Sequence, residues 1–212
     1  LEFTGFISGV AYHPLWLGFG RVLAGSFVML VGVSLALSSR SPFRPSAYLL
    51  RLTKIGVAAV AITLVTWYVF PATFIYFGIL HAIAVATLVG TLFQRTPWWL
   101  SLASGAGMLV VPSLWQSELF DTRWLAWIGF AQNVPPSNDF VPVFPWVGIT
   151  LMGMAGTKVL IDNRKEYALD HMLPIGRPKN ALVWLGKRSL IIYLFHQPIM
   201  LAIIMQLARF LV

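Results

Sequence analysis

Polar side chains interrupt the last apolar stretch of the chain, which reads LGKRSLIIYLFHQPIMLAIIMQL (185–207). His196 follows Lys187 by nine residues, which places it about 13 Å further along a helix. The pKa of a histidine is easily moved to neutrality, so an imidazole can act as a general base. We expect His196 and Gln197 to line a polar cavity. The alternative is a structural kink, because Pro198 removes a backbone hydrogen bond and a neighbouring polar group then satisfies the freed carbonyl.

Two further ionisable residues lie inside apolar stretches, where such groups are costly and usually face a cavity. His81 lies in FIYFGILHAIAVATL, and Arg21 lies in the first apolar stretch, within LGFGRVLAG. His81 could transfer a proton, or it could be a neutral histidine that is hydrogen-bonded between helices. Arg21 could contact a substrate at the mouth of a cavity, or it could extend its charge to the lipid headgroups.

Three more candidates stand just before apolar stretches. His13, in AYHPLWLGFG, precedes the first stretch, where it is either a catalytic base or an ordinary loop residue. Asn138 and Asp139 belong to QNVPPSNDFVPVFPW, which leads into the fifth stretch. This segment could hold a carboxylate over the mouth of a cavity, or the two residues could cap a turn or a helix.

The sequence lacks the signatures of several other chemistries. There is no cysteine, which excludes disulfides, thiolate metal sites and cysteine nucleophiles. No glycine-rich phosphate loop, no His-Glu-x-x-His metal spacing and no serine nucleophile elbow is present. We therefore predict that the protein binds no metal.

Composition indicates the class of protein that positions these residues. Hydrophobic residues make up 58% of the chain and charged residues 10%, with a mean hydropathy of +0.78, whereas soluble domains carry about 25% charged residues. The net charge of +8 is typical of basic cytoplasmic loops in a membrane protein and does not indicate nucleic-acid binding. The sequence predicts an all-α, polytopic transmembrane helix bundle with a single domain, residues 1–212.

Six apolar stretches are long enough for a spanning helix, which needs about 20 residues. They cover residues 15–37, 49–70, 74–93, 98–115, 143–161 and 189–212.

Basic residues predict the orientation of these spans. Twelve of the 15 Lys and Arg residues fall in three alternate loops. They are Arg40, Arg44, Arg51, Lys54, Arg95, Lys158, Arg164, Lys165, Arg177, Lys179, Lys187 and Arg188. The positive-inside rule places these loops in the cytoplasm, so we predict an inner-membrane protein with residue 1 and the C-terminus on the outer side. Because the first span then begins outside, we expect one preceding span, which gives seven in the intact chain; a removed signal sequence is the alternative.

Four stretches resemble a known family. RVLAGSFVMLVGVSLAL (21–37), YFGILHAIAVATL (76–88), NDFVPVFPWVGITLMG (138–153) and LGKRSLIIYLFHQPIM (185–200) are similar, in order and spacing, to the bacterial membrane proteins related to heparan-α-glucosaminide N-acetyltransferase. His13 and Trp16, in HPLW, resemble the His-x-x-Trp around the histidine of the animal enzyme. The chain departs from the family in lacking its first helix, with an Asp-x-x-Arg-Gly start and a downstream histidine.

The resemblance implies an activity. Such enzymes take an acetyl group from cytoplasmic acetyl-CoA and place it on the amine of a sugar on the far side of the membrane, and a membrane histidine takes part. We therefore predict an acyltransferase with acetyl-CoA as donor and a sugar or cell-envelope glycan as acceptor. The predicted roles are His13 or His81 as catalytic base, and Asp139 as the acid that orients the acceptor. The cavity is assigned to Arg21, Asn138, His196 and Gln197, and the CoA phosphates to Lys187 and Arg188.

Two other classes of function stay open at this point. The chain could be a non-catalytic membrane subunit that packs against a partner protein or against copies of itself, because it is small and shows no soluble domain. A small-molecule transporter is the weaker alternative, since no inverted repeat or pair of broken helices is visible. Membrane lipids are expected to contact the protein in each case.

Overall fold

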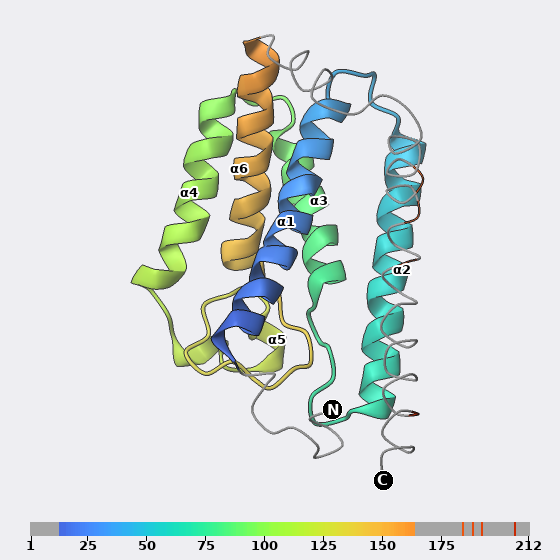
Figure 1. Cartoon of the computed structure of the whole chain (residues 1–212), viewed down its shortest axis with the longest axis vertical. Coiled ribbons are helices and arrows are strands. Elements are labelled where there is room, and N and C mark those ends of the chain that lie inside the picture. The colour runs from blue at the N-terminus through green and yellow to red at the C-terminus, as the bar shows by residue number, and fades with distance from the viewer. Residues whose placement is uncertain (1–12, 164–183, 185–187, 189–191, 193–205, 207–212) are drawn as a thin grey trace. The chain divides into compact units, whose positions relative to one another are not determined.

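The computed structural model describes residues 13–163, together with 184, 188, 192 and 206 (Figure 1). The chain divides into two compact units, one formed by Ala24–Lys165 and the other by Leu1–Leu23 with Glu166–Val212. Within 13–163 every regular element is a helix, which confirms the all-α prediction. The helices are α1 (Pro14–Ser38), α2 (Pro45–Val69), α3 (Ile79–Phe93), α4 (Trp98–Leu114), the 3₁₀ turn η1 (Glu118–Phe120), α5 (Arg123–Ala126) and α6 (Val143–Asp162).

Three helices are long and apolar enough to cross a membrane. These are α1, α2 and α6, with mean hydropathies of 1.8, 1.7 and 1.4 over their most apolar windows. The helices α3 and α4 coincide with predicted spans but have only 15 and 17 residues, fewer than the usual 20 or so. The count of six spans therefore stays a prediction, and the sixth, 189–212, lies outside the described residues.

The predicted span 74–93 is wrong at its start, because the helix begins five residues later, at Ile79. The preceding residues are apolar, but their backbone is extended, and Phe77 forms an isolated parallel bridge with Phe140. Hydrophobicity alone does not distinguish such a buried extended segment from the first turn of a helix.

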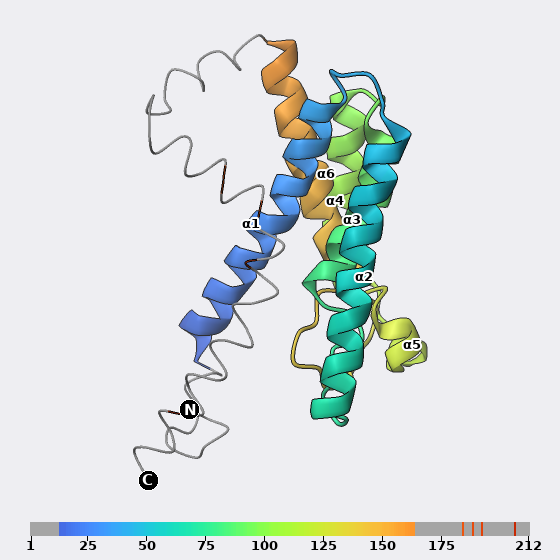
Figure 2. The same cartoon turned by 90° about the vertical axis from the view of Figure 1, so that its right-hand side faces the viewer.

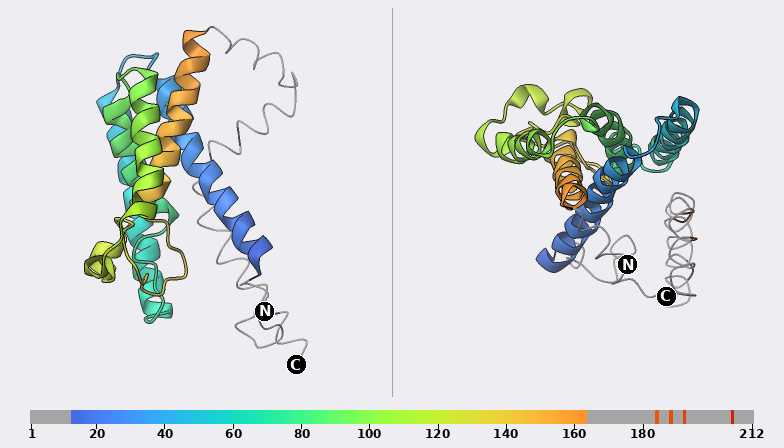
Figure 3. Two further views of the ribbon diagram at one scale, coloured as in Figure 1. Left: turned by 90° about the vertical axis from the view of Figure 1, so that its left-hand side faces the viewer. Right: turned by 90° about the horizontal axis from the view of Figure 1, so that it is seen from above.

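Helix α6 forms the centre of the 24–165 unit. Its residues Val147, Leu151 and Met154 are fully buried, and it packs mainly against α4 and α3 (Figures 2 and 3). A Cβ atom at Gly148 would lie 2.7 Å from the carbonyl oxygen of Gly105 on α4. Only a residue without a side chain allows this approach, which is the usual way in which transmembrane helices pack closely.

The antiparallel course of the helices gives the 24–165 unit two different ends. The basic end carries the turns 39–44 and 94–97, which join α1 to α2 and α3 to α4 (Figure 1). The loop end carries segments 70–78 and 115–142. Arg40, Arg44 and Arg95 lie in the basic-end turns, whereas Asp139 and Arg123 lie at the loop end. The orientation of these ends across a membrane stays a prediction.

Candidate functional site

Two segments of the loop end run side by side and together position Asp139. The N–H of Asn138 donates to the carbonyl oxygen of Thr73 at 2.8 Å, and the N–H of Val141 donates to that of Phe77 at 3.1 Å. The hydroxyl of Tyr76 donates to the carbonyl oxygen of Pro135 at 3.2 Å. These contacts fix the register of 135–141 against 73–79, so a carboxylate from one segment reaches the helix that follows the other.

Asp139 binds the first turn of α3. Its Oδ2 accepts a hydrogen bond from the N–H of Ile79 at 2.8 Å, which satisfies a helix N-terminal donor and places negative charge at the positive end of the helix dipole. Burial raises the pKa of this carboxyl, and the bond from Ile79 opposes that rise. Oδ1 makes no hydrogen bond to the described residues, and it is not fully buried among them.

His81 lies on the same turn and joins α3 to α2. Its Nδ1 accepts from the N–H of Gly78 at 3.3 Å, and its Nε2 lies 3.3 Å from Oγ1 of Thr63. The Thr63 hydroxyl in turn donates to the carbonyl oxygen of Ile75 at 2.8 Å. These contacts together assign a neutral imidazole that carries its proton on Nε2. The arrangement matches the interhelical histidine that was the alternative for this residue, and it leaves Nδ1 as the atom that can accept a proton.

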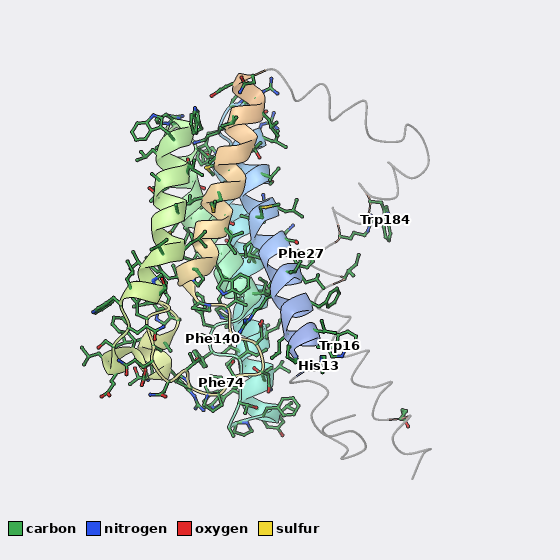
Figure 4. All side chains as sticks on the ribbon, turned by 60° about the vertical axis from the view of Figure 1, so that its left-hand side comes forward. His13, Trp16, Phe27, Phe74, Phe140 and Trp184 are labelled. Carbon is green, nitrogen blue, oxygen red and sulfur yellow. The ribbon has the colours of Figure 1, made fainter. Side chains whose placement is uncertain are left out.

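Aromatic rings surround this turn. Phe77 lies between His81 and Trp127, with ring centroids 5.4 Å from each. Tyr76 lies between Phe74 and Phe140, at 6.2 and 5.5 Å, and Figure 4 shows Phe74 and Phe140 at the loop end. The first turn of α3 is therefore bordered by apolar ring surface.

The rest of the 115–142 loop is held by its own polar contacts. Asp121 accepts hydrogen bonds from the backbone N–H groups of Gln132 and Asn133 at 2.7 and 2.9 Å and from the Asn133 amide at 3.0 Å, and these bonds lower its pKa. Arg123 donates to the carbonyl oxygen of Ala72 at 2.7 Å and lies over the ring of Phe74. The loop is therefore tied both to itself and to segment 70–78.

The structure brings together two of the predicted site residues. His81 and Asp139, 58 positions apart, bind the consecutive N–H groups of Gly78 and Ile79. Asn138 contributes to this region through its backbone, while its side chain is exposed.

Two other candidates belong to the unit that contains residues 1–23, which is described by itself. His13 is exposed at the start of α1, and its Nδ1 accepts a local hydrogen bond from the N–H of Leu15 at 3.3 Å (Figure 4). Arg21 is exposed on the same helix. A shared cavity that joins these residues to His81 stays a prediction.

The remaining candidates come from the last part of the chain. His196, Gln197 and Lys187 lie outside the described residues. Arg188 is described, and its guanidinium lies 4.3 Å from the centroid of the exposed Trp184 ring.

Sequence reasoning missed Thr63 and misjudged the setting of Lys158. Thr63 lies in the apolar run AVAITLVTWYV, where its hydroxyl, with that of Thr66, was the available signal. Lys158 was counted as a loop residue, but it lies in α6 and is only 9% exposed. Its ammonium group donates to the carbonyl oxygens of Phe93 and Thr96 at 2.6 and 2.7 Å and to Oγ of Ser101 at 3.1 Å. Lysine is buried here because carbonyl and hydroxyl oxygens satisfy its N–H donors.

In the part of the chain that the structure describes, no group of three or more His, Asp or Glu side chains is arranged to hold a metal ion.

The sequence matches a known protein family, although no curated protein and no solved structure matches it. The family described as heparan-alpha-glucosaminide N-acetyltransferase, catalytic, matches residues 1–198, which is nearly the whole chain. The chain therefore belongs to the heparan-alpha-glucosaminide N-acetyltransferase catalytic-domain family.

Proposed function

We propose that the protein is a membrane acetyltransferase that moves an acetyl group from cytoplasmic acetyl-CoA to the amine of a sugar or envelope glycan on the outer side. The observation that carries the proposal is the family match over residues 1–198, since that range includes every residue of the loop-end site. Three helices long enough to span a bilayer support a membrane location.

The chemistry needs a base and a group that holds the acceptor. The amine nitrogen attacks the thioester carbonyl, so a C–N bond forms, the C–S bond breaks, and the amine gives up a proton while the CoA sulfur leaves as thiolate and is then protonated. His81, through Nδ1, or His13 takes the proton in this proposal. For His81 to do so, its long bond from the N–H of Gly78 at 3.3 Å opens.

Asp139 is suited to hold the acceptor. One oxygen is fixed by Ile79, and this fixes the direction of the other oxygen, which has no hydrogen-bond partner among the described residues. A carboxylate oxygen in a partly buried setting binds an ammonium or hydroxyl group more strongly than it would in water. The aromatic rings beside it add apolar contact for a sugar ring.

The proposal is tested by an assay on the full chain purified in a mild detergent. Acetyl-CoA and glucosamine are supplied, free CoA thiol is measured by a colorimetric reaction, and N-acetylglucosamine is measured by mass spectrometry. We expect the two products to form in equal amounts. Release of thiol without acetylated sugar, for glucosamine and for longer amino-sugar oligomers, would contradict the proposal.

Replacing Asp139 by asparagine should weaken acceptor binding and change the pH dependence. The amide oxygen can still accept from Ile79, so α3 keeps its cap, but the charge-assisted bond to the acceptor is lost, and the KM for the acceptor rises by about 10- to 100-fold. In the wild type the carboxylate is required, and burial raises its pKa. The acidic limb of kcat/KM should therefore lie at a higher pH than for an ordinary carboxyl group and should disappear in Asp139→Asn.

The matched control is Glu118→Gln, which removes the same charge from an exposed position at the loop end. It should leave both the KM and the acidic limb unchanged. An Asp139→Asn enzyme with the wild-type KM and pH profile would show that Asp139 only caps α3.

A further inference from the structure

A pocket with three arginines lies at the basic end of the 24–165 unit, and its lining comes from the end of α1, the start of α2 and the end of α3. Its volume is about 890 Å³, Arg44, Arg51 and Arg95 line it, and none of its described lining residues is acidic. Arg44 is the N-cap of α2, Arg51 lies about two turns further along, and Arg95 follows the end of α3. The three charges thus come from different positions and meet around one cavity.

These arginines have no counter-charge in the part of the chain that the structure describes. None of the three pairs there with a carboxylate, and three of the four described acids, Glu118, Asp121 and Asp139, lie at the loop end. Like charges around a cavity with apolar walls repel one another and produce a positive potential that attracts anions. A bound anion would relieve this repulsion.

The backbone at the pocket adds to the same potential. Helix α2 begins with Pro45, its N-cap side chain makes no capping bond, and its first turn contains no acidic residue. The N–H groups of this first turn therefore have no helix partner, and the positive end of the helix dipole lies at the pocket, where Ala47 forms part of the lining.

The walls of the pocket are held in place and include aromatic surface. The Gln94 side chain donates to the carbonyl oxygen of Leu35 at 3.2 Å and to Oγ of Ser38 at 3.1 Å, which ties the end of α3 to the end of α1. On the opposite side Phe43 and Tyr48 pack together with ring centroids 5.5 Å apart. Arginine forks bind phosphate oxygens in pairs, and an aromatic face suits the flat base of a nucleotide.

We propose that this pocket binds the clustered phosphates of an anionic ligand, with Arg44, Arg51 and Arg95 as the binding groups. Two sources have this chemistry, the nucleotide end of CoA and the headgroup of an anionic lipid. The assignment to CoA rests on the proposed function. It agrees with the layout, because Arg95 lies about 20 Å along α3 from His81, and CoA carries its phosphates and its thiol at opposite ends of a long arm.

The test measures binding of defined probes to the full chain in neutral detergent, without acceptor or turnover. The probes are CoA, ADP and phosphate-free pantetheine. Arg44→Gln, Arg51→Gln and Arg95→Gln should each weaken CoA and ADP binding by about tenfold or more, and the loss should shrink as salt is raised. Pantetheine binding should not change. Lys54→Gln, which removes an exposed charge from α2 outside the pocket, should have less than a twofold effect.

A second arm distinguishes the two sources. Wild type and the three variants are compared for thermal stability in nanodiscs of neutral lipid, with and without phosphatidylglycerol. Weakened CoA binding in the variants supports the nucleotide source, and stabilisation by phosphatidylglycerol that the variants lose supports a lipid headgroup.

The proposal is overturned if the variants bind CoA and ADP like wild type and respond to phosphatidylglycerol like wild type, or if wild type responds to none of the probes. Acetyl transfer with an unchanged KM for acetyl-CoA in the arginine variants would remove the CoA assignment and leave the proposed function standing. Arginine-dependent CoA binding without acetyl transfer would support the CoA assignment and contradict the proposed function.

Discussion

Replacing His81 by alanine should lower kcat for acetyl transfer by about 10²- to 10⁴-fold, the usual contribution of a positioned general base. The purified variant should remain monodisperse, because the ring lies at one end of α3 and the centre of the unit is formed by α6 residues such as Leu151. The measurement is the acetyl-transfer rate at saturating acetyl-CoA and acceptor, with size-exclusion chromatography to check assembly.

A purely structural role for His81 predicts a different pattern among matched variants. The imidazole holds Thr63 of α2 and the N–H of Gly78, and a glutamine amide can make similar bonds. Thr63→Val removes the interhelical bond and keeps the imidazole. If His81 is the base, His81→Gln stays as inactive as His81→Ala, and Thr63→Val keeps most of the activity. If glutamine restores the rate, His81 acts only as a tie between α2 and α3, and the base is His13.

The second large effect concerns Lys158. Lys158→Met should destabilise the protein, because it removes the bonds that join α6 to the carbonyl oxygens of Phe93 and Thr96 and to the hydroxyl of Ser101. Phe93 and Ser101 keep contacts with Thr96, whereas the carbonyl oxygen of Thr96 loses its donor. Each buried acceptor that loses its partner costs about 1–3 kcal/mol. The lost bonds lie where α3, α4 and α6 meet, so the melting temperature in detergent should fall more than for any exposed substitution.

Lys54→Met makes the same chemical change at an exposed position on α2. Substitutions at such sites usually change stability by less than about 0.5 kcal/mol. A fall of equal size for the two variants, measured by intrinsic tryptophan fluorescence on heating, would show that the bonds of Lys158 contribute nothing beyond its charge.

The helices could be predicted from the sequence largely because apolar length determines them. The predictions 15–37, 98–115 and 143–161 differ from α1, α4 and α6 by a single residue at one or both ends. The start of α3 could not be predicted in this way. Residues 74–78 are as apolar as a helix, but Phe77 pairs with Phe140, which lies about 60 positions away in the sequence.

The site was predicted only in part, for a related reason. His81 and Asp139 were both identified because an ionisable group near an apolar segment is costly. Their meeting on Gly78 and Ile79 depends on the register of two loop segments, which no local pattern encodes. Lys158 was assigned to a loop from its charge, since the oxygens that stabilise it come from other parts of the chain. Arg44, Arg51 and Arg95 were used only for orientation, because their shared pocket exists only after α1, α2 and α3 pack.

The central claim is that the protein carries an acetyl group across a membrane, and reconstitution into sealed liposomes tests it most directly. Glucosamine is enclosed inside the vesicles, and radiolabelled acetyl-CoA, which does not cross the bilayer, is added outside. We predict that labelled N-acetylglucosamine accumulates in the lumen with wild-type protein and not with His81→Ala or with empty vesicles. A lumen that stays free of labelled product, around intact and folded wild-type protein, would contradict the claim.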